Sequence, residues 1–263
     1  MVNAAIQDPA MIRGLLETQG IRIAWFSLGS APLIEIAGQS FNVGLIDLQH
    51  GLWDRQGAHL AIGVLDVPSI VRSADSSHAR IGEALDSGAA GVLVPAIENA
   101  DQARAIVNAS LYPSAGSRSG GGVQPLSRGF DQYYRRCREP VIGAMIESVE
   151  AARNAEAIAR VPGIDFLFIG TGNLALSLGC FPQVDDRLEK ECRAIFEACR
   201  RAEKPCGIFT GSAAWARQKL IEGYRAVVVA DDVSIVRQGF AAAGQEAVHP
   251  AFEHSPLRGG DAE

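Results

Sequence analysis

The strongest constraint on the fold is a repeated alternation of short apolar runs with longer segments that carry helix signals. Most of the runs are apolar throughout rather than at every second residue, a pattern typical of strands buried on both faces of a parallel sheet. Eight such runs follow one another along the chain: 21–28, 43–48, 67–72, 90–95, 141–147, 164–170, 204–209 and 225–230. The sequence therefore predicts an α/β protein with eight parallel strands.

The segments between these runs have recognisable helix ends. Residues 76–88 begin with serines and end at a glycine, residues 148–163 stop at Pro-Gly, and residues 185–204 run from acids to bases, as the helix dipole favours. Seven such segments, with an eighth after the last strand, match a single-domain (β/α)8 TIM barrel over residues 1–250. An open, Rossmann-like sheet is the alternative, but no strand leads into a GxGxxG turn. The tail, 251–263, is expected to be disordered or to lie at a subunit contact.

Composition narrows the choice of partners and of compartment. The 263-residue chain is 48% hydrophobic and carries a net charge of −6, which argues against a nucleic-acid partner because phosphate binding needs a basic face. No apolar run approaches a membrane span, and the N-terminus lacks the features of a signal peptide. The five cysteines show no CxxC pair or zinc spacing, so we expect buried thiols and a cytoplasmic protein.

Several polar residues stand where the predicted strands end, which is where barrel enzymes carry their catalytic groups. His50 follows the second strand, Arg72 ends the third, Glu147 ends the fifth, and the turn 170–173 follows the sixth, while Trp25 lies on the first. Each of these residues alone has an equally good structural explanation, such as a surface ion pair for Arg72. As a set, they predict one site at the barrel mouth.

These segments resemble the HpcH/HpaI family of class II, metal-dependent pyruvate aldolases, in the wider phosphoenolpyruvate/pyruvate barrel superfamily. The resemblance covers nearly the whole chain in order, through "DLQHG", "SIVR", "ALDSGAAGVLVPAIENADQA", "LYPSAGSRSGG" and "MIESVEAARNAEAIARVPGIDFLFIGTGNLALSLG". It implies the barrel and a homo-oligomer, a hexamer or a dimer, in which the last helix is exchanged between subunits.

The resemblance also implies roles for individual residues. His50 is expected to act as general base through water, with Asp86 orienting it, and Arg72 is expected to stabilise the developing oxyanion. Glu147 and the residue at position 173 are expected to bind a divalent metal, Mg²⁺ or Mn²⁺, whose oxygen preference they suit.

Further contacts to the substrate, a 2-oxo acid, are also expected. Trp25 matches a tryptophan near the family's site, and the backbone amides of Gly172 and Asn173 are expected to hold the substrate carboxylate. The Gly/Ser-rich segment 112–129 lacks the GK[ST] of a phosphate loop. We expect it to cover the barrel mouth, with Arg118 reaching a substrate carboxylate.

The chain departs from the family pattern at three positions. Asn173 replaces the metal-binding aspartate, so two carboxylates become one and metal affinity should fall. Met145 and Gln49 stand where close relatives often have glutamine and glutamate. The change at position 173 leaves three interpretations open: weak metal binding through Glu147 and substrate oxygens, anion binding without metal, or loss of aldol chemistry.

The leading hypothesis for function is a carbon–carbon lyase that reversibly cleaves a 4-hydroxy-2-oxo acid to a pyruvate-type enolate and an aldehyde. One alternative is a citrate-synthase-like condensation of oxaloacetate with acetyl-CoA, of the siderophore-pathway type. The other is a non-catalytic barrel that binds a 2-oxo acid.

Overall fold

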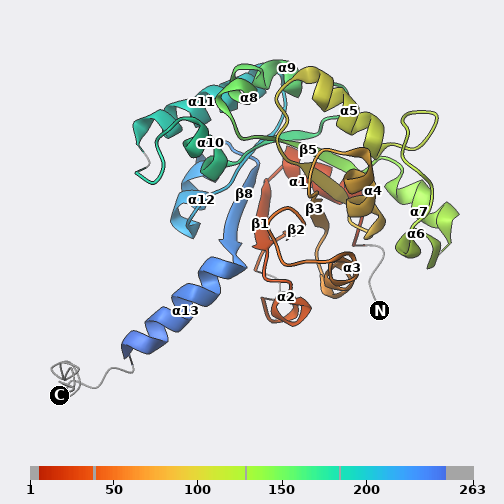
Figure 1. The fold of residues 1–263 in the computed structure, drawn as a ribbon, viewed down its shortest axis with the longest axis horizontal. Helices are drawn as coiled ribbons and strands as arrows, with labels where there is room; N and C mark the ends of the chain where they lie inside the picture. The colour runs from red at the N-terminus through yellow and green to blue at the C-terminus, as the bar shows by residue number, and fades with distance from the viewer. Residues whose placement is uncertain (1–5, 38–39, 128, 184, 247–263) are drawn as a thin grey trace, which may run out of the picture.

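A computed structural model describes residues 6–37, 40–127, 129–183 and 185–246 and confirms the predicted barrel (Figure 1). Eight parallel strands pair in chain order, and β8 closes the barrel against β1. The strands are β1 (Ile21–Phe26), β2 (Val43–Asp47), β3 (Ser69–Arg72), β4 (Gly91–Val94), β5 (Val141–Ile146), β6 (Phe166–Ile169), β7 (Cys206–Ile208) and β8 (Ala226–Asp231).

Most of the helices lie around this barrel, and the last helix projects away from it, as Figure 1 shows. They are α1 (Pro9–Glu17), α2 (Ala31–Ala37), α3 (Arg55–Val64), α4 (His78–Asp86), α5 (Ala100–Ser110), α6 (Val123–Ser127), α7 (Phe130–Cys137), α8 (Val149–Arg153), α9 (Ala155–Ala159), α10 (Thr171–Ser177), α11 (Asp186–Arg201), α12 (Ala213–Ile221) and α13 (Asp232–Glu246). The helix predicted over 148–163 is interrupted at Asn154, whose side-chain amide donates a hydrogen bond to the carbonyl of Glu98.

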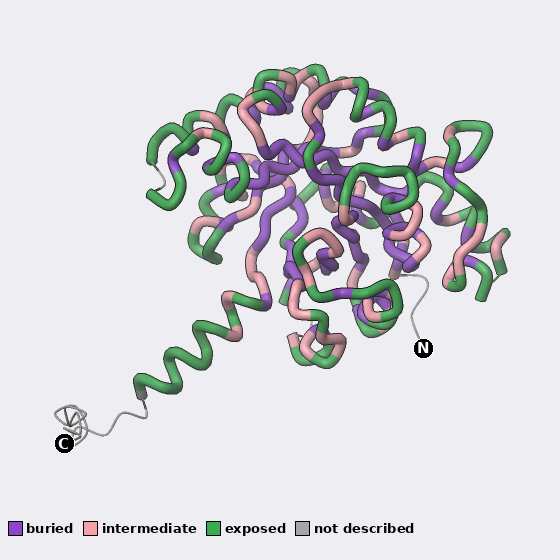
Figure 2. Tube along the Cα trace, in the orientation of Figure 1, coloured by how far each residue is buried: buried purple, intermediate pink, exposed green. Residues whose placement is uncertain are grey.

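Two apolar clusters lie on either side of the strands, which explains why the strand sequences are apolar throughout. One fills the barrel and includes Ile23, Leu45 and Phe166, and the other lies between the strands and the helices and includes Ile46, Val92 and Ile195. Successive strand side chains alternate between these two clusters. Figure 2 accordingly shows the strands buried and the outer surfaces of the helices exposed.

Helix α1 closes the amino-terminal end of the barrel. Ile12 and Leu16 pack into the interior cluster. Arg13 fixes the helix in place, because its Nε donates to Asp165 Oδ1 at 2.7 Å and its Nη2 donates to the carbonyl of Pro140. The cavity at the opposite end is therefore closed below.

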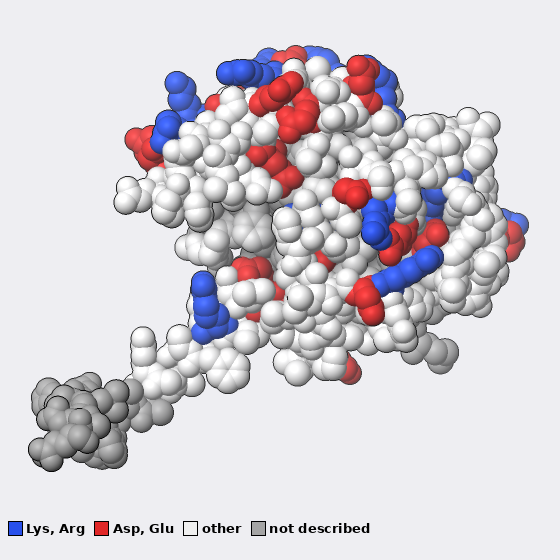
Figure 3. Space-filling model, in the orientation of Figure 1, with Lys and Arg blue, Asp and Glu red and all other residues white. Residues whose placement is uncertain are grey.

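Helix α13 projects away from the barrel (Figure 1). It starts directly after β8, and the Asp232 carboxylate ties it to β1 by accepting hydrogen bonds from the backbone N–H groups of Ser27 and Leu28. Val233, Ile235 and Phe240 are exposed on it, and Figure 3 shows few charged side chains along this arm. Exchange of this helix between subunits stays a prediction, and the tail at 251–263 lies outside the described residues.

Two expectations from composition can be compared with the structure. All five cysteines are buried and free: Cys137, Cys180, Cys192, Cys199 and Cys206. Within the described ranges, no helix combines the length and the apolar character needed to cross a bilayer.

Candidate active site

A cavity of about 280 Å³ opens at the carboxyl ends of the strands. Six of the eight predicted site residues line it: Trp25, His50, Arg72, Glu147, Gly172 and Asn173. The rest of the lining comprises Ser27, Asp47, Met145, Gly170, Thr171, Phe209 and Asp231. The residues that follow separate strands therefore do meet in one place, as the strand-end argument predicted.

Asp47 and Arg72 form a buried ion pair at the centre of one wall. They end neighbouring strands in register, and Arg72 donates twice, from Nε to Oδ1 at 2.8 Å and from Nη2 to Oδ2 at 2.5 Å. The guanidinium also lies 4.8 Å from the centre of the Trp25 ring, whose Nε1–H donates to Asp47. This bidentate geometry fixes the direction in which Arg72 presents its remaining N–H groups.

The pKa of Asp47 lies below its ordinary value. Burial alone would raise this pKa, but the hydrogen bonds and charge of Arg72 outweigh burial, and N–H groups of His50 and Trp25 add to the stabilisation of the anion. Asp47 is therefore ionised throughout the neutral range, which keeps Arg72 paired and oriented.

The same carboxylate shapes the turn that carries His50. Asp47 Oδ1 accepts hydrogen bonds from the backbone N–H groups of Gln49 and His50. A Cβ at Gly51 would lie 2.2 Å from the carbonyl oxygen of Asp47, so the turn requires glycine there. The His50 side chain is exposed toward the cavity rather than packed, so it is free to meet a ligand.

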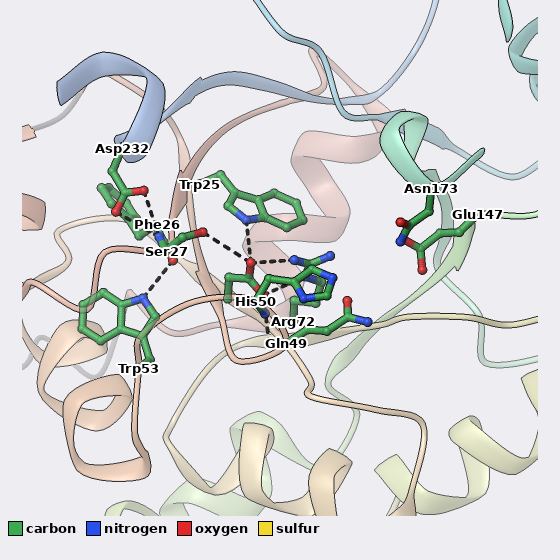
Figure 4. A network of polar contacts seen from close by, with 11 residues as sticks. Trp25, Phe26, Ser27, Gln49, His50, Trp53, Arg72, Glu147, Asn173 and Asp232 are labelled. Atoms are coloured by element: carbon green, nitrogen blue, oxygen red, sulfur yellow. Dashed lines mark hydrogen bonds and ion pairs between the residues drawn. The ribbon is translucent and has the colours of Figure 1, made fainter. Parts of the chain in front are cut away.

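Glu147 and Asn173 lie together on the facing wall, opposite His50, Arg72 and Trp25 (Figure 4). The Asn173 side-chain N–H donates to Glu147 Oε1 at 2.9 Å, and the backbone N–H of Ala96 donates to Oε2 at 3.0 Å. Glu147 is only 8% exposed. The two neutral donors satisfy a buried carboxylate that would otherwise be costly.

The backbone around Glu147 is adapted to hold it. Ala96 has φ of +56°, a left-handed conformation that is unfavourable for alanine, and in this conformation its N–H bonds the carboxylate. A Cβ at Gly170 would lie 2.7 Å from Glu147 Oε1. Glu147 is therefore held from both sides.

Helix α10 begins at the edge of the cavity. Its N-cap residue is Gly170, and among the described residues no side chain caps this end. The first N–H groups of a helix have no partner within the helix, and those of Gly172 and Asn173 adjoin the cavity lining. An anionic group in the cavity can accept hydrogen bonds from them.

Two predicted site residues lie elsewhere in this chain. Asp86 ends α4, and its carboxylate accepts a hydrogen bond from Arg118 Nη2 at 2.8 Å rather than contacting His50. Arg118 is 1% exposed, and its guanidinium lies 4.6 Å from the centre of the Tyr112 ring and donates to the Tyr133 hydroxyl. In this chain Arg118 is thus buried beside Tyr112 and Tyr133, outside the cavity lining, and its contact with a substrate carboxylate stays a prediction.

Among the lining residues that were not predicted to belong to the site, three stand at strand ends: Asp47, Phe209 and Asp231. Asp47 carries more of the site's polar contacts than any predicted residue, and its position at the end of an apolar run was the available signal. Asp231 and Phe209 stand at the ends of the last two strands, where the same rule would have placed them.

A larger cavity, of about 550 Å³, lies at the amino-terminal end of the barrel. Several of its charged groups already have partners: Arg13 pairs with Asp165, Lys204 donates to the carbonyl of Ile164, and Arg225 to that of Thr18. It also lies away from the strand ends that carry chemistry in barrels. We therefore assign the site to the smaller cavity.

The cavity combines the Arg72 guanidinium and the first N–H groups of α10 with the Glu147–Asn173 pair. Such a set of groups can bind a small anion and stabilise the negative charge that develops on it during a reaction. Fold and site together define a (β/α)8 enzyme of organic-acid chemistry. The chain belongs to the HpcH/HpaI aldolase/citrate lyase family, whose profile matches residues 22–238.

Individual relatives indicate which activity within this family the chain resembles. The chain is 34% identical over 220 residues to a hydroxypyruvate/pyruvate aldolase of Rhizorhabdus wittichii, covering 81% of this chain and 88% of that protein. It is 32% identical over 250 residues to a 2-keto-3-deoxy-L-rhamnonate aldolase of Klebsiella pneumoniae, covering 90% and 92%. A solved HpcH/HpaI family protein of Burkholderia cenocepacia superposes with a TM-score of 0.83 at 29% identity, covering 90% of this chain and 98% of that one. The protein is an aldolase, a carbon–carbon lyase.

Proposed function

We propose that the protein reversibly cleaves a 4-hydroxy-2-oxo acid to a pyruvate-type enolate and an aldehyde. The observation that carries the proposal is the meeting of His50 and Arg72 with Glu147 and Asn173 in one cavity of about 280 Å³. No feature of the structure favours the citrate-synthase-like condensation or the non-catalytic binder over this reaction.

The charges of the cavity support a divalent cation as part of the reacting complex. Among its described lining residues, Arg72 is positive and Asp47, Glu147 and Asp231 are negative, which leaves a formal charge of −2 with His50 neutral. A 2-oxo acid brings a further negative charge into this partly buried site, where repulsion is poorly screened. A divalent cation that accompanies the substrate reduces that repulsion.

The donor atoms fit Mg²⁺ or Mn²⁺, although with less charge than is usual. Members of the family are generally metal-dependent, and carboxylate and amide oxygens are the ligands these ions prefer. Glu147 supplies the charge, and Asn173 can supply its amide oxygen once it turns its amide nitrogen away from Glu147. Within the described ranges no group of three His, Cys, Asp or Glu residues that could hold a metal ion exists, so a bound cation would need oxygens from the substrate or from water as well.

Each residue then has a defined part in the reaction. The N–H groups of Gly172 and Asn173 bind the substrate carboxylate, and Arg72 donates to the oxygen that becomes negative. His50 removes the proton of the C4 hydroxyl through a water, the C3–C4 bond breaks to release the aldehyde, and the electron pair stays on the C2–C3 enolate, which is then protonated at C3. The metal, when bound, supplies Lewis-acid stabilisation of the enolate.

Proton exchange at the methyl group of pyruvate tests the first half of this chemistry in isolation. In D₂O with Mg²⁺ or Mn²⁺, we expect the protein to exchange the methyl protons of pyruvate, observed by NMR. A His50→Gln variant should slow the exchange by about 10²–10⁴-fold, the range for a lost general base. His59→Gln, on α3 and outside the cavity lining, is the matched control and should leave the rate unchanged.

The same experiment separates the alternatives. If the protein binds pyruvate but does not exchange its methyl protons, the lyase proposal is rejected in favour of a non-catalytic binding protein. Thiol release from acetyl-CoA in the presence of oxaloacetate would favour the synthase.

We also propose that the protein is a homo-oligomer in which α13 packs on a second copy of the chain. The exposed apolar residues on this projecting helix, Val233, Ile235 and Phe240, support this, because apolar surface of this kind is normally covered by a partner. Light scattering should give a mass at least twice the 27.9 kDa of the chain, and Ile235→Glu with Phe240→Glu should shift it toward the monomer. A monomeric wild-type protein would refute the assembly.

A cytoplasmic location is also proposed. Five reduced, buried cysteines support it, since oxidising compartments favour disulfides. Recovery of the native protein from a secreted or periplasmic fraction would contradict it.

A further inference from the structure

Asp231 is a lining residue to which the proposed reaction gives no role. It is the last residue of β8, and its Cα pairs in register with that of Trp25 on β1. Phe209 follows β7 on the other side and packs edge-on against the Trp25 ring at 5.3 Å. Asp231 thus stands between β7 and β1, whereas Glu147 and Asn173 follow β5 and β6.

Asp231 also has an oxygen that the fold does not use. Of the three lining carboxylates, Asp47 accepts hydrogen bonds at both oxygens, and so does Glu147. Asp231 Oδ1 accepts the backbone N–H of Ser234 at 2.8 Å and thereby caps α13. Its Oδ2 has no hydrogen-bond partner within the described part of the chain, and the residue is half-buried at the cavity edge. Capping explains one oxygen and leaves the other available to a ligand.

The distribution of charge decides which part of the substrate meets this oxygen. A substrate carboxylate is attracted to Arg72 and to the α10 N–H groups and repelled by Asp231. The oxo-acid half therefore lies toward α10, and the other half, which leaves as the aldehyde, lies toward Trp25, Phe209 and Asp231. A carboxylate acceptor beside two aromatic rings suits a hydroxyl group on a short carbon chain.

We propose that Asp231 determines which aldehyde the enzyme uses: it accepts a hydrogen bond from the hydroxyl of an uncharged hydroxyaldehyde and excludes aldehydes that carry an acid group. This inference rests on the proposed aldolase function and adds the chemical class of the second substrate. A site built to bond a hydroxyl discriminates against the analogue that lacks it, because the polar group of the protein then loses its partner. A second anion would in turn face an unpaired carboxylate.

The test compares three aldehydes in condensation with pyruvate: glyceraldehyde, which is uncharged with hydroxyls, propanal, which has neither charge nor hydroxyl, and succinic semialdehyde, which is anionic. The quantity measured is kcat/KM for each aldehyde. Asp231→Asn keeps the shape and removes the charge, and Asp231→Ser removes the extended acceptor. Both replacements are good helix caps, so α13 keeps its start.

In the wild type we expect glyceraldehyde to be preferred over both other aldehydes. Asp231→Asn should raise kcat/KM for succinic semialdehyde relative to glyceraldehyde by at least about tenfold, the size of effect one pocket contact commonly has on selectivity. Asp231→Ser should lower the preference for glyceraldehyde over propanal by a similar factor. Comparing ratios between variants cancels the differences in size among the aldehydes.

Asp54→Asn is the matched control, because Asp54 caps α3 through Gly57 N–H in the same way but does not line the cavity. It should leave both ratios unchanged. Ratios that stay within twofold of the wild type in both Asp231 variants would overturn the inference. Pyruvate proton exchange is measured alongside: unchanged aldehyde ratios with normal exchange reject only the role of Asp231, whereas absence of exchange in the wild type rejects the aldolase proposal and this inference with it.

Discussion

An Asp47→Asn variant should slow pyruvate exchange by at least about 100-fold and lose about 3–5 kcal/mol of stability, the cost of leaving one partner of a buried ion pair alone. The reason is that Asp47 orients Arg72 through two hydrogen bonds and accepts the N–H groups of the His50 turn. Urea unfolding measures the stability, and NMR exchange measures the chemistry.

The stability loss should depend on pH in a defined direction. Because the folded protein lowers the pKa of Asp47, the ionised carboxylate stabilises the fold fully above its unfolded pKa of about 3.9. This contribution is lost as the pH falls further, through the lowered folded pKa. The difference between wild type and Asp47→Asn should therefore be constant from pH 7 to about pH 5 and shrink below about pH 4.

Asp165→Asn provides a matched comparison at the other end of the barrel. Asp165 also receives two hydrogen bonds from an arginine, Arg13, but outside the cavity. This variant should lose stability while its exchange, measured on the folded protein, stays close to that of the wild type. Equal losses of exchange in both variants would show that Asp47 acts only through general stability.

An Asn173→Asp variant should bind Mn²⁺ about 10–100-fold more tightly than the wild type when no 2-oxo acid is present, because ligand charge sets the affinity of such sites. In the wild type, Glu147 is the carboxylate that contacts Asn173, and it already accepts a hydrogen bond from the Asn173 amide. Calorimetry with Mn²⁺, with and without oxalate as a mimic of the enolate's two oxygens, measures the effect. Wild-type binding should depend strongly on oxalate.

Three comparisons make this result specific. Glu147→Gln should abolish Mn²⁺ binding with or without oxalate. Asn99→Asp, which adds the same charge at the cap of α5, should behave like the wild type. Without metal, Asn173→Asp should be less stable than the wild type, because two carboxylates then face each other, and Mn²⁺ should reverse that loss. Indistinguishable Mn²⁺ affinities of wild type and Asn173→Asp without oxalate would remove position 173 from the metal site.

The barrel and most of the cavity could be predicted from the sequence because both depend on the position of the apolar strands. Strands that are apolar on both faces are visible in the sequence, and their ends mark where His50, Arg72 and Glu147 must converge. The polar partner of Arg72 was not predicted, because an aspartate at the end of an apolar run looks the same whether it faces solvent or forms a buried pair.

The two predicted site residues that lie outside the cavity of this chain do not stand at strand ends. Asp86 stands at the end of a helix and Arg118 in a segment without periodicity, so nothing local fixes their direction. Only the packing of Tyr112 and Tyr133 around the guanidinium decides where that segment goes. Similarly, the break at Asn154 follows from a contact with Glu98, which is distant in sequence.

Because α1 closes the amino-terminal end of the barrel, ligands can reach the cavity only from the other end. Ile12 and Leu16 fill the amino-terminal end of the barrel. Every molecule that reaches the cavity therefore enters and leaves at the carboxyl ends of the strands. Both products of a cleavage therefore have to leave through the same opening by which the substrate entered.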